Sequence, residues 1–144
     1  MENNLKTYQN IHVSSLNQKE LIVLLYSGAL RFIDEGKEMI NKNDVPGTFE
    51  KLNRARNIFL HLLSTLDMEK GGEFADKLSA LYAYFVEKIT MANATKIISE
   101  LDDIIPLIEN IKNSWENIDI TKEDIPKSVK KVNSKPVQVF SAEV

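Results

Sequence analysis

The residues of this chain that could carry metal or acid–base chemistry begin with its two histidines, His12 and His61. A di-iron centre between helices needs inward glutamates and paired Glu-x-x-His motifs. Gln9 and Ile58 stand three positions before the two histidines, so neither motif is present. His61 also falls on the polar side of the helix that is expected around it. We therefore expect both histidines to be solvated side chains rather than ligands or bases.

Carboxylates offer another route to catalysis, because a pair of them can act as general acid and general base. They cluster at Asp34, Glu35 and Glu38 and again at Asp102 and Asp103. Both clusters fall on the polar faces of expected helices, which favours solvated surface groups. The sequence also contains no cysteine, no Gly-x-Ser-x-Gly elbow and no phosphate-binding glycine loop. We therefore predict a protein that is not an enzyme and has no catalytic residue, cofactor or metal site.

Composition limits the class of protein further. The 144 residues, 43% of them hydrophobic and 27% charged, are enough for one domain with a single core. A total of 18 Lys and Arg against 21 Asp and Glu gives a net charge of -3, which disfavours nucleic acid as a partner. Apolar runs such as 21–26 are far shorter than the roughly 20 residues of a membrane span. Because the N-terminus lacks the order of a secretory signal, a cytoplasmic protein without membrane insertion is expected.

Apolar residues recur at spacings of three and four between a few glycines and prolines, which is the period of helices with one buried face. The spacing predicts four helices, over 16–42, 48–67, 73–92 and 95–118. Short links between them favour an all-α fold, an antiparallel four-helix bundle. Ser15 and Gln18 are expected to form a capping box at the start of the first helix. Gly71 and Gly72 are expected to form a turn, and Pro106 is expected to kink the fourth helix.

Each helix has a predicted core stripe, found by winding it at about 100° per residue. In the first two helices the stripes are Leu21, Leu25, Ala29, Phe32, Gly36, Met39 and Ile40, and then Leu52, Ala55, Phe59, Leu62, Leu63 and Leu66. In the last two they are Phe74, Leu78, Leu81, Tyr82, Phe85 and Ile89, and then Ile97, Leu101, Ile104, Ile108, Ile111 and Trp115. These stripes are predicted to pack together in one core, 16–118.

Several large apolar side chains lie away from the centres of these stripes. They are Val23, Tyr26 and Leu30 on the first helix, Phe49 and Leu60 on the second, and Tyr84 on the third. Any one of them could belong to the flank of a wide core stripe. Together they exceed what the seams of four helices can bury, and monomers seldom leave large apolar patches uncovered. We therefore predict that this set forms a surface that binds a partner.

Two segments flank the predicted bundle. The N-terminal segment, 1–15, is expected to pack across the bundle, either as a structural strap or as a removable cover that competes with the partner. The residues leave these alternatives open, and Tyr8 and Ile11 of this segment join the predicted partner-binding set. In the C-terminal tail, 119–144, the helical period ends and lysines accumulate. That tail is expected to be flexible or disordered, or else to dock as an extended strand.

Between 8 and 115 an ordered set of residues stands at the spacing of a known family. The set is Tyr8, Val13, Ser15, Glu20, Leu21, Ile22, Leu25, Tyr26, Gly28, Ala29, Phe32, Ile33, Arg54, Ala55, Ile58, Leu66, Asp67, Gly71, Gly72, Glu73, Ala75, Leu78, Leu81, Tyr82, Tyr84 and Trp115. It resembles the flagellar secretion chaperones of the FliS type. The resemblance implies a four-helix bundle that binds the C-terminal segment of flagellin, which is disordered when free and drives filament polymerisation. It also implies that the N-terminal segment occupies part of the groove when the partner is absent.

The resemblance therefore predicts a chaperone that prevents premature polymerisation of flagellin and keeps it competent for the flagellar type III secretion apparatus. Components of the export gate are candidate further partners. The residues themselves also fit a structural bundle that self-associates through the same apolar surface without a flagellin client. The free chain is expected to be a monomer or a weak homodimer.

Overall fold

The computed structural model describes residues 17–118, and this part of the chain is all-α. Its elements are α2 (Gln18–Asn41), α3 (Val45–Ser64), α4 (Met68–Thr95), α5 (Ser99–Asp102) and α6 (Ile105–Glu116). The predicted fold class, an all-α helical bundle, is confirmed. None of the helices within this range is long and apolar enough to span a membrane. The expectations for 1–16 and 119–144, including Tyr8, Ile11 and the tail, lie outside the described residues.

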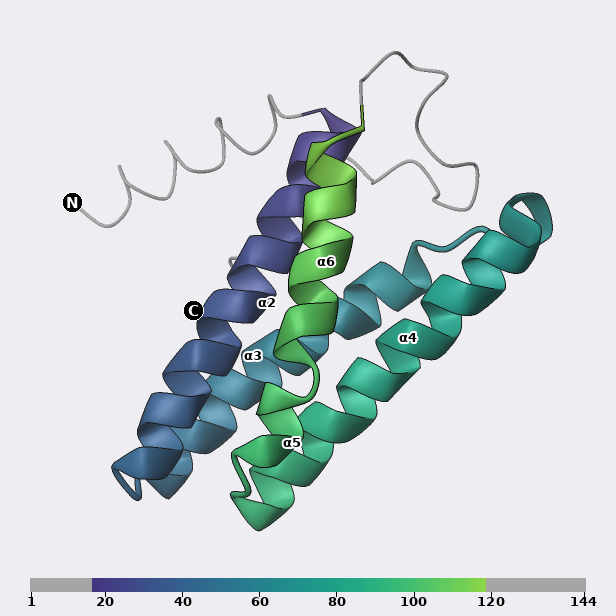
Figure 1. The fold of residues 1–144 in the computed structure, drawn as a ribbon. Coiled ribbons are helices and arrows are strands. Elements are labelled where there is room, and N and C mark those ends of the chain that lie inside the picture. The colour runs from purple at the N-terminus through teal and green to yellow at the C-terminus, as the bar shows by residue number, and fades with distance from the viewer. Residues whose placement is uncertain (1–16, 119–144) are drawn as a thin grey trace, which may run out of the picture.

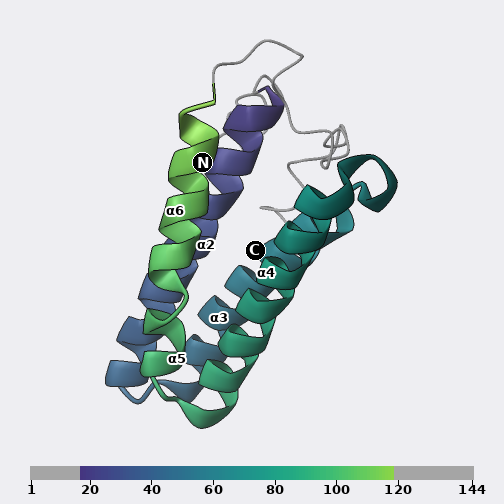
Figure 2. The same cartoon turned by 45° about the vertical axis from the view of Figure 1, so that its right-hand side comes forward.

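Consecutive long helices are antiparallel neighbours, with α2 on α3 and α3 on α4. The chain then returns through α5, which lies against α4, to α6, which packs along α2 (Figure 1). Lys19 Nζ donates a hydrogen bond of 2.7 Å to the backbone oxygen of Ile118, so the first turn of α2 meets the end of α6. Figure 2 shows α4 diverging from α6 toward that end of the bundle. One side of α4 is therefore left without a covering helix among the described elements.

The centre of the bundle is aromatic and holds a buried hydroxyl pair. The ring of Phe59 lies 5.0 Å from that of Phe85 and 6.1 Å from that of Tyr82, and Trp115 of α6 is buried as well. The hydroxyl groups of Tyr26 and Tyr82 hydrogen-bond to each other. Burial raises the pKa of Tyr82 to about 12, and it raises the pKa of Tyr26 well above its ordinary value, with the nearby Tyr82 adding to the effect. Both groups are thus neutral and paired inside the core.

The helices α2 and α3 approach closely because a glycine faces α3. A Cβ atom added at Gly36 would lie 2.4 Å from Cδ2 of Leu52 and 2.9 Å from its Cγ, which is too close for any carbon. Beside this contact, the guanidinium of Arg54 lies over the ring of Phe32, 5.6 Å from its centroid. The predicted core stripes of these two helices therefore meet along a tight seam.

The helix α2 begins later than predicted. Its N-cap is Asn17, whose Oδ1 accepts a hydrogen bond of 2.8 Å from the backbone nitrogen of Glu20. Asn17 Nδ2 donates in turn to Glu20 Oε1 at 2.9 Å. The prediction of a box formed by Ser15 and Gln18 is wrong, because Asn17 and Glu20 have the same spacing two residues further on and Gln18 is the first helical residue.

The helix α3 begins earlier than predicted, at Val45, and absorbs residues that were expected in the preceding turn. Asp44 caps it by accepting a hydrogen bond of 2.9 Å from the backbone nitrogen of Gly47. Pro46 lies in the first turn, where its missing N–H costs no intrahelical hydrogen bond. A proline that suggests a turn in the sequence is thus a helix start in the structure.

The second half of the chain departs most from the prediction. Gly72, at a φ of 52°, is non-helical and kinks α4 shortly after it begins, so the predicted glycine turn separates a short first helical segment from the long remainder of α4. The helix then runs to Thr95, and Lys96 ends it at a φ of 61°. The prediction of one fourth helix over 95–118 is wrong, because this range forms α5 and α6. Pro106 lies in the first turn of α6 rather than kinking a longer helix.

Candidate partner-binding surface

The predicted partner-binding residues of α3 and α4 lie at the surface. Phe49 is 59% exposed, Leu60 38% and Tyr84 37%. Phe49 and Leu60 are eleven residues apart, which is close to three full turns, so they share a face of α3. Tyr84 lies on the side of α4 that carries Lys88, whose ammonium lies 5.9 Å from the tyrosine ring centroid. Their exposure agrees with a binding role, which itself stays a prediction.

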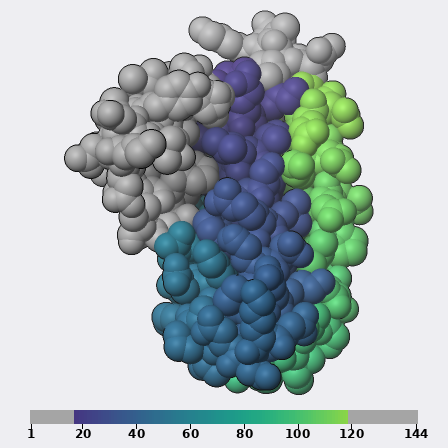
Figure 3. Space-filling view, turned by 90° about the vertical axis from the view of Figure 1, so that its left-hand side faces the viewer, coloured from purple at the N-terminus to yellow at the C-terminus, as the bar shows by residue number. Residues whose placement is uncertain are grey.

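The predicted residues of α2 are placed differently. Tyr26 is fully buried, so its assignment to the partner surface is wrong. Its ring belongs to the core because α2 packs against both α3 and α6, which widens the buried stripe. Val23 and Leu30 are half-buried against the core and, seven residues apart, share one edge of α2. Lys19, four residues before Val23, binds the end of α6, so this edge borders α6, which runs along α2 in Figure 3.

A groove of about 580 Å³ runs between the first half of α3 and the last part of α4. Its walls are Val45, Pro46, Phe49, Asn53 and Arg56 from α3, with Ile89, Thr90, Asn93 and Ala94 from α4 and Lys96 just after it. The antiparallel packing brings these two helix ends together. Phe49 is exposed in the groove, whereas Ile89 is buried. Of the predicted partner-binding residues, Phe49 is the member that lines this groove.

Both charged side chains that line the groove are cations. Lys96 Nζ donates a hydrogen bond to the backbone oxygen of Asn93. Arg56 forms no ion pair with any residue of the described range, and its Nε is buried there without an acceptor. No aspartate or glutamate of the described helical region lines the groove. The surface therefore combines an exposed aromatic ring with a guanidinium that lacks an acidic partner within 17–118.

A second apolar area lies on α4 and just beyond it. Phe74 was predicted in the core, but it is 48% exposed, because α6 packs on α2 and leaves this side of α4 uncovered. Tyr84 and Met91, seven residues apart, are also exposed on α4 and share one face. Ile97 was predicted in the core of a fourth helix and is 49% exposed, because the helix ends at Lys96. The core predictions for Phe74 and Ile97 are therefore wrong.

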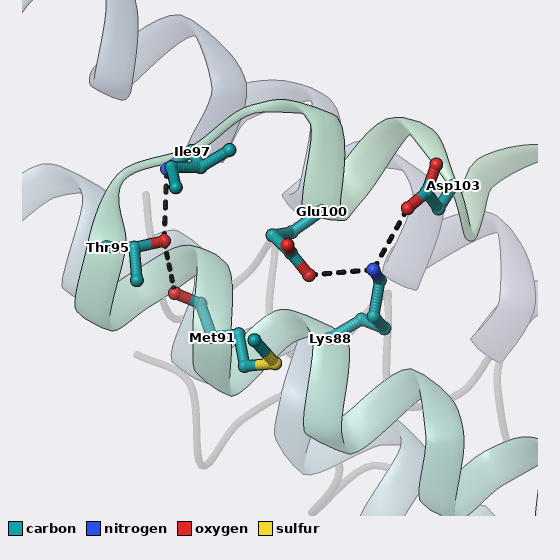
Figure 4. Close-up of polar contacts among 6 residues, drawn as sticks. All are labelled: Lys88, Met91, Thr95, Ile97, Glu100 and Asp103. Atoms are coloured by element: carbon teal, nitrogen blue, oxygen red, sulfur yellow. Dashed lines mark hydrogen bonds and ion pairs between the residues drawn. The ribbon is translucent and has the colours of Figure 1, made fainter.

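A bridging lysine holds α5 against α4, as Figure 4 shows. Lys88 Nζ lies 2.7 Å from Glu100 Oε2 and 2.9 Å from Asp103 Oδ2. The hydrogen bonds to Glu100 and then to Asp103 raise the pKa of Lys88. The hydroxyl of Thr95 accepts a hydrogen bond of 3.3 Å from the backbone nitrogen of Ile97, which fixes the start of the connecting loop. These contacts position the loop that follows the groove.

The structure shows what surrounds the carboxylates and the histidine that the sequence analysis selected as candidates for catalysis. Asp102 pairs with Lys37 at 2.7 Å, and Glu35 pairs with Lys51 at 3.5 Å. His61 is half-buried rather than solvated as predicted; its Nε2 is buried without a hydrogen-bond partner among the described residues, and burial lowers its pKa. Within 17–118, no group of three His, Cys, Asp or Glu side chains could hold a metal ion.

Similarity to known proteins extends over this whole helical region. The family model described as "Flagellar protein FliS" matches residues 1–122. The chain belongs to the FliS family. This FliS-family chain is 33% identical over 122 residues to the flagellar secretion chaperone FliS of Vibrio cholerae, a match that covers 82% of this chain and 90% of that protein. The resemblance stated from the residues is confirmed.

Two further flagellar secretion chaperones named FliS are similar to this FliS-family chain. The protein of Campylobacter jejuni is 31% identical over 120 residues, covering 82% of this chain and 94% of its own. The protein of Salmonella typhimurium is 31% identical over 119 residues, covering 79% of this chain and 88% of its own. Membership of a chaperone family implies a role without catalysis.

Sequence reasoning missed two candidate residues of the groove in this FliS-family chain. Val45 and Arg56 were not selected, although Val45, Phe49, Arg56 and Leu60 recur at spacings of four, seven and four on one face of α3. That spacing is visible in the sequence and could have placed all four together. The contribution of α4 could not be found in this way, because it depends on which end of α4 lies beside the start of α3.

Proposed function

We propose that this FliS-family chain binds the C-terminal segment of flagellin in the cytoplasm. Binding covers that hydrophobic segment, prevents premature polymerisation of the subunit and keeps it competent for the flagellar type III secretion apparatus. The observation that carries the proposal is the exposed Phe49 in the groove between α3 and α4. Leu60 and Tyr84 extend the binding surface, and Val23 and Leu30 add a half-buried edge on α2.

The energetics of such a surface favour a long, flexible client. Burying four large apolar side chains at roughly 1.5 to 3 kcal/mol each gains about 6 to 12 kcal/mol before the costs of association are subtracted. A disordered segment that folds on binding also loses conformational entropy. Because the binding free energy is what remains after these costs, a client that covers several separate apolar areas binds better than one that fills the groove alone.

The N-terminal segment is part of the proposal. Tyr8 and Ile11 act as a removable cover that occupies apolar surface of the bundle until the client displaces it. This arrangement shields the exposed side chains of the free chain and lowers its tendency to self-associate. It also predicts that binding is slower when the cover is intact.

The test is a calorimetric titration of the full-length chain with a synthetic peptide of the host's flagellin C-terminus, with the fluorescence of Trp115 as a second signal. We expect saturable one-to-one binding, a gain of helix by circular dichroism and a negative heat-capacity change. Phe49→Ala is expected to weaken binding about tenfold or more. Leu107→Ala is the matched control, because Leu107 is an exposed apolar residue of α6 outside the proposed surface.

Absence of binding at tens of micromolar peptide, with the helical bundle intact, would contradict the proposal. Sedimentation of the same samples would then separate the self-associating bundle from a monomer with another client. Concentration-dependent dimers that Phe49→Ala dissociates would favour the self-associating bundle. Equal losses from Phe49→Ala and Leu107→Ala would show that the groove has no special part in binding.

A further inference from the structure

We infer that the groove between α3 and α4 holds a stretch of the client that carries an aspartate or glutamate near a large apolar side chain, and that Arg56 pairs with this carboxylate. This rests on the proposed function, to which it adds the residue that selects the bound segment. Phe49 supplies the apolar contact and Arg56 the charge, both from one face of α3.

Arg56 and its neighbour Arg54 on the same helix differ in the contacts that their guanidinium groups make. Arg54 Nη2 lies 3.0 Å from Glu50 Oε1, and its guanidinium also covers the ring of Phe32. Arg56 is half-buried in the groove, has no ion pair within 17–118, and has a buried Nε without an acceptor. A buried donor without an acceptor is unfavourable, and a guanidinium binds a carboxylate through strong, directional hydrogen bonds. The residues within 17–118 therefore leave this groove donor free to bind an acceptor from a partner.

The charge of the groove points to an acidic partner rather than a neutral one. Of the residues in 17–118, Arg56 and Lys96 are the charged side chains that line it, and no acidic side chain of that range does. The chain as a whole has a net charge of -3, so this local positive charge does not follow from composition. Positive potential over an apolar groove attracts a segment that combines a carboxylate with apolar side chains.

The spacing along α3 limits which client segments fit. Phe49 and Arg56 are seven residues apart, which is about 10 Å along the helix axis at 1.5 Å per residue. A client segment that meets both carries its apolar side chain and its carboxylate about seven residues apart if it is helical. The separation is about three residues if the segment is extended. These two separations can be compared directly with the distances along the peptide between its acidic and its large apolar residues.

The test is a double-mutant cycle between the full-length chain and the flagellin C-terminal peptide. Each Asp or Glu of the peptide is changed in turn to its amide, and affinities are measured by calorimetry for the wild type and for Arg56→Gln. We expect Arg56→Gln to weaken binding about tenfold or more. One amide change in the peptide is expected to give a similar loss, with little further loss when the two are combined. Arg54→Gln is the matched control and is expected to leave affinity unchanged.

The outcomes separate this inference from the proposed function. If the wild type binds the peptide and Arg56→Gln, folded by circular dichroism, binds it equally well, the role of Arg56 is refuted and the chaperone proposal stands. If no amide change reduces affinity, the carboxylate is refuted. If the wild type does not bind, the proposed function itself fails. If Arg56→Gln abolishes a dimer seen by sedimentation but leaves peptide affinity unchanged, the groove holds a second copy and the client assignment is wrong.

Discussion

The buried hydroxyl pair at the centre of the bundle allows a quantitative test of the core. Replacing Tyr82 with Phe leaves the Tyr26 hydroxyl without its tyrosine partner, although that hydroxyl also interacts with Trp115. We expect a loss of about 1 kcal/mol in the free energy of unfolding. Tyr26→Phe leaves the Tyr82 hydroxyl unpaired within the described core and removes the contact of Trp115 as well. Its expected cost is about 2 to 3 kcal/mol.

The double variant distinguishes a hydrogen-bonded pair from two independent tyrosines. Removing both hydroxyls leaves neither one unpaired, so the double variant is expected to be no less stable than Tyr26→Phe alone. The coupling is then about 1 kcal/mol, which corresponds to a difference of about 4 °C in Tm for a chain of this size. Urea unfolding is followed by far-ultraviolet circular dichroism and by the fluorescence of Trp115, the single tryptophan of the chain.

Tyr84→Phe is the matched control for these variants. Tyr84 lies on the same helix as Tyr82, but its side chain is exposed, so its loss is expected to be within about 0.5 kcal/mol of zero. If the two single losses add in the double variant, the hydroxyls do not form a pair and the reasoning is refuted. The same conclusion follows if Tyr26→Phe costs no more than Tyr84→Phe.

Three further predictions concern the seam between α2 and α3, the half-buried His61 and the proposed N-terminal cover. Gly36→Val is expected to lower the free energy of unfolding by about 1 to 3 kcal/mol because it overlaps Leu52, and in thermal denaturation the loss caused by Leu52→Ala is expected to be smaller in the Gly36→Val chain than in the wild type. His61 has a lowered pKa when folded, so the unfolded chain binds more protons near its ordinary pKa of about 6.5 and stability is lost as the pH falls through that value. Chemical unfolding at several pH values checks this, and His61→Gln is expected to flatten the profile. Tyr8→Ala with Ile11→Ala is expected to speed binding of the flagellin peptide in stopped-flow fluorescence without lowering Tm, and an unchanged rate would refute the cover.

The sequence was more informative for the first half of the bundle, because the apolar spacing within one helix indicates which of its faces is buried. The apolar period along α2 and α3 gave part of the buried face of each helix, and Leu52, Ala55 and Phe59 are fully buried as expected. Ile22, Ile33 and Ile58 are also buried, although the predicted stripes did not contain them. The predicted N-cap of α2 was wrong, because Asn17 and Ser15 are both good N-caps with suitable partners three residues later. Only the hydrogen bonds of the folded chain select Asn17.

The second half could not be predicted as well because it depends on contacts between distant elements. Phe74 has the spacing of a core residue, and it is exposed because α6 packs on α2. Tyr26 of α2 has the spacing of a flank residue, and it is buried because α6 packs on α2. The groove likewise required the relative position of two helix ends. Arg56 shows the limit most clearly, since its lack of an ion pair within 17–118 is a property of the folded surface and not of its neighbours in sequence.

The contact between Lys19 and Ile118 has a consequence for the topology of the bundle. Because the two ends of the described helical region lie side by side, the succession from α2 to α6 is nearly a closed ring. Domains with adjacent ends generally tolerate circular permutation. A short linker from 118 back to 17, with new ends opened in the turn around Asn43, should preserve the helix contacts. The order in which the helices are joined is then less important to this bundle than which of them are neighbours.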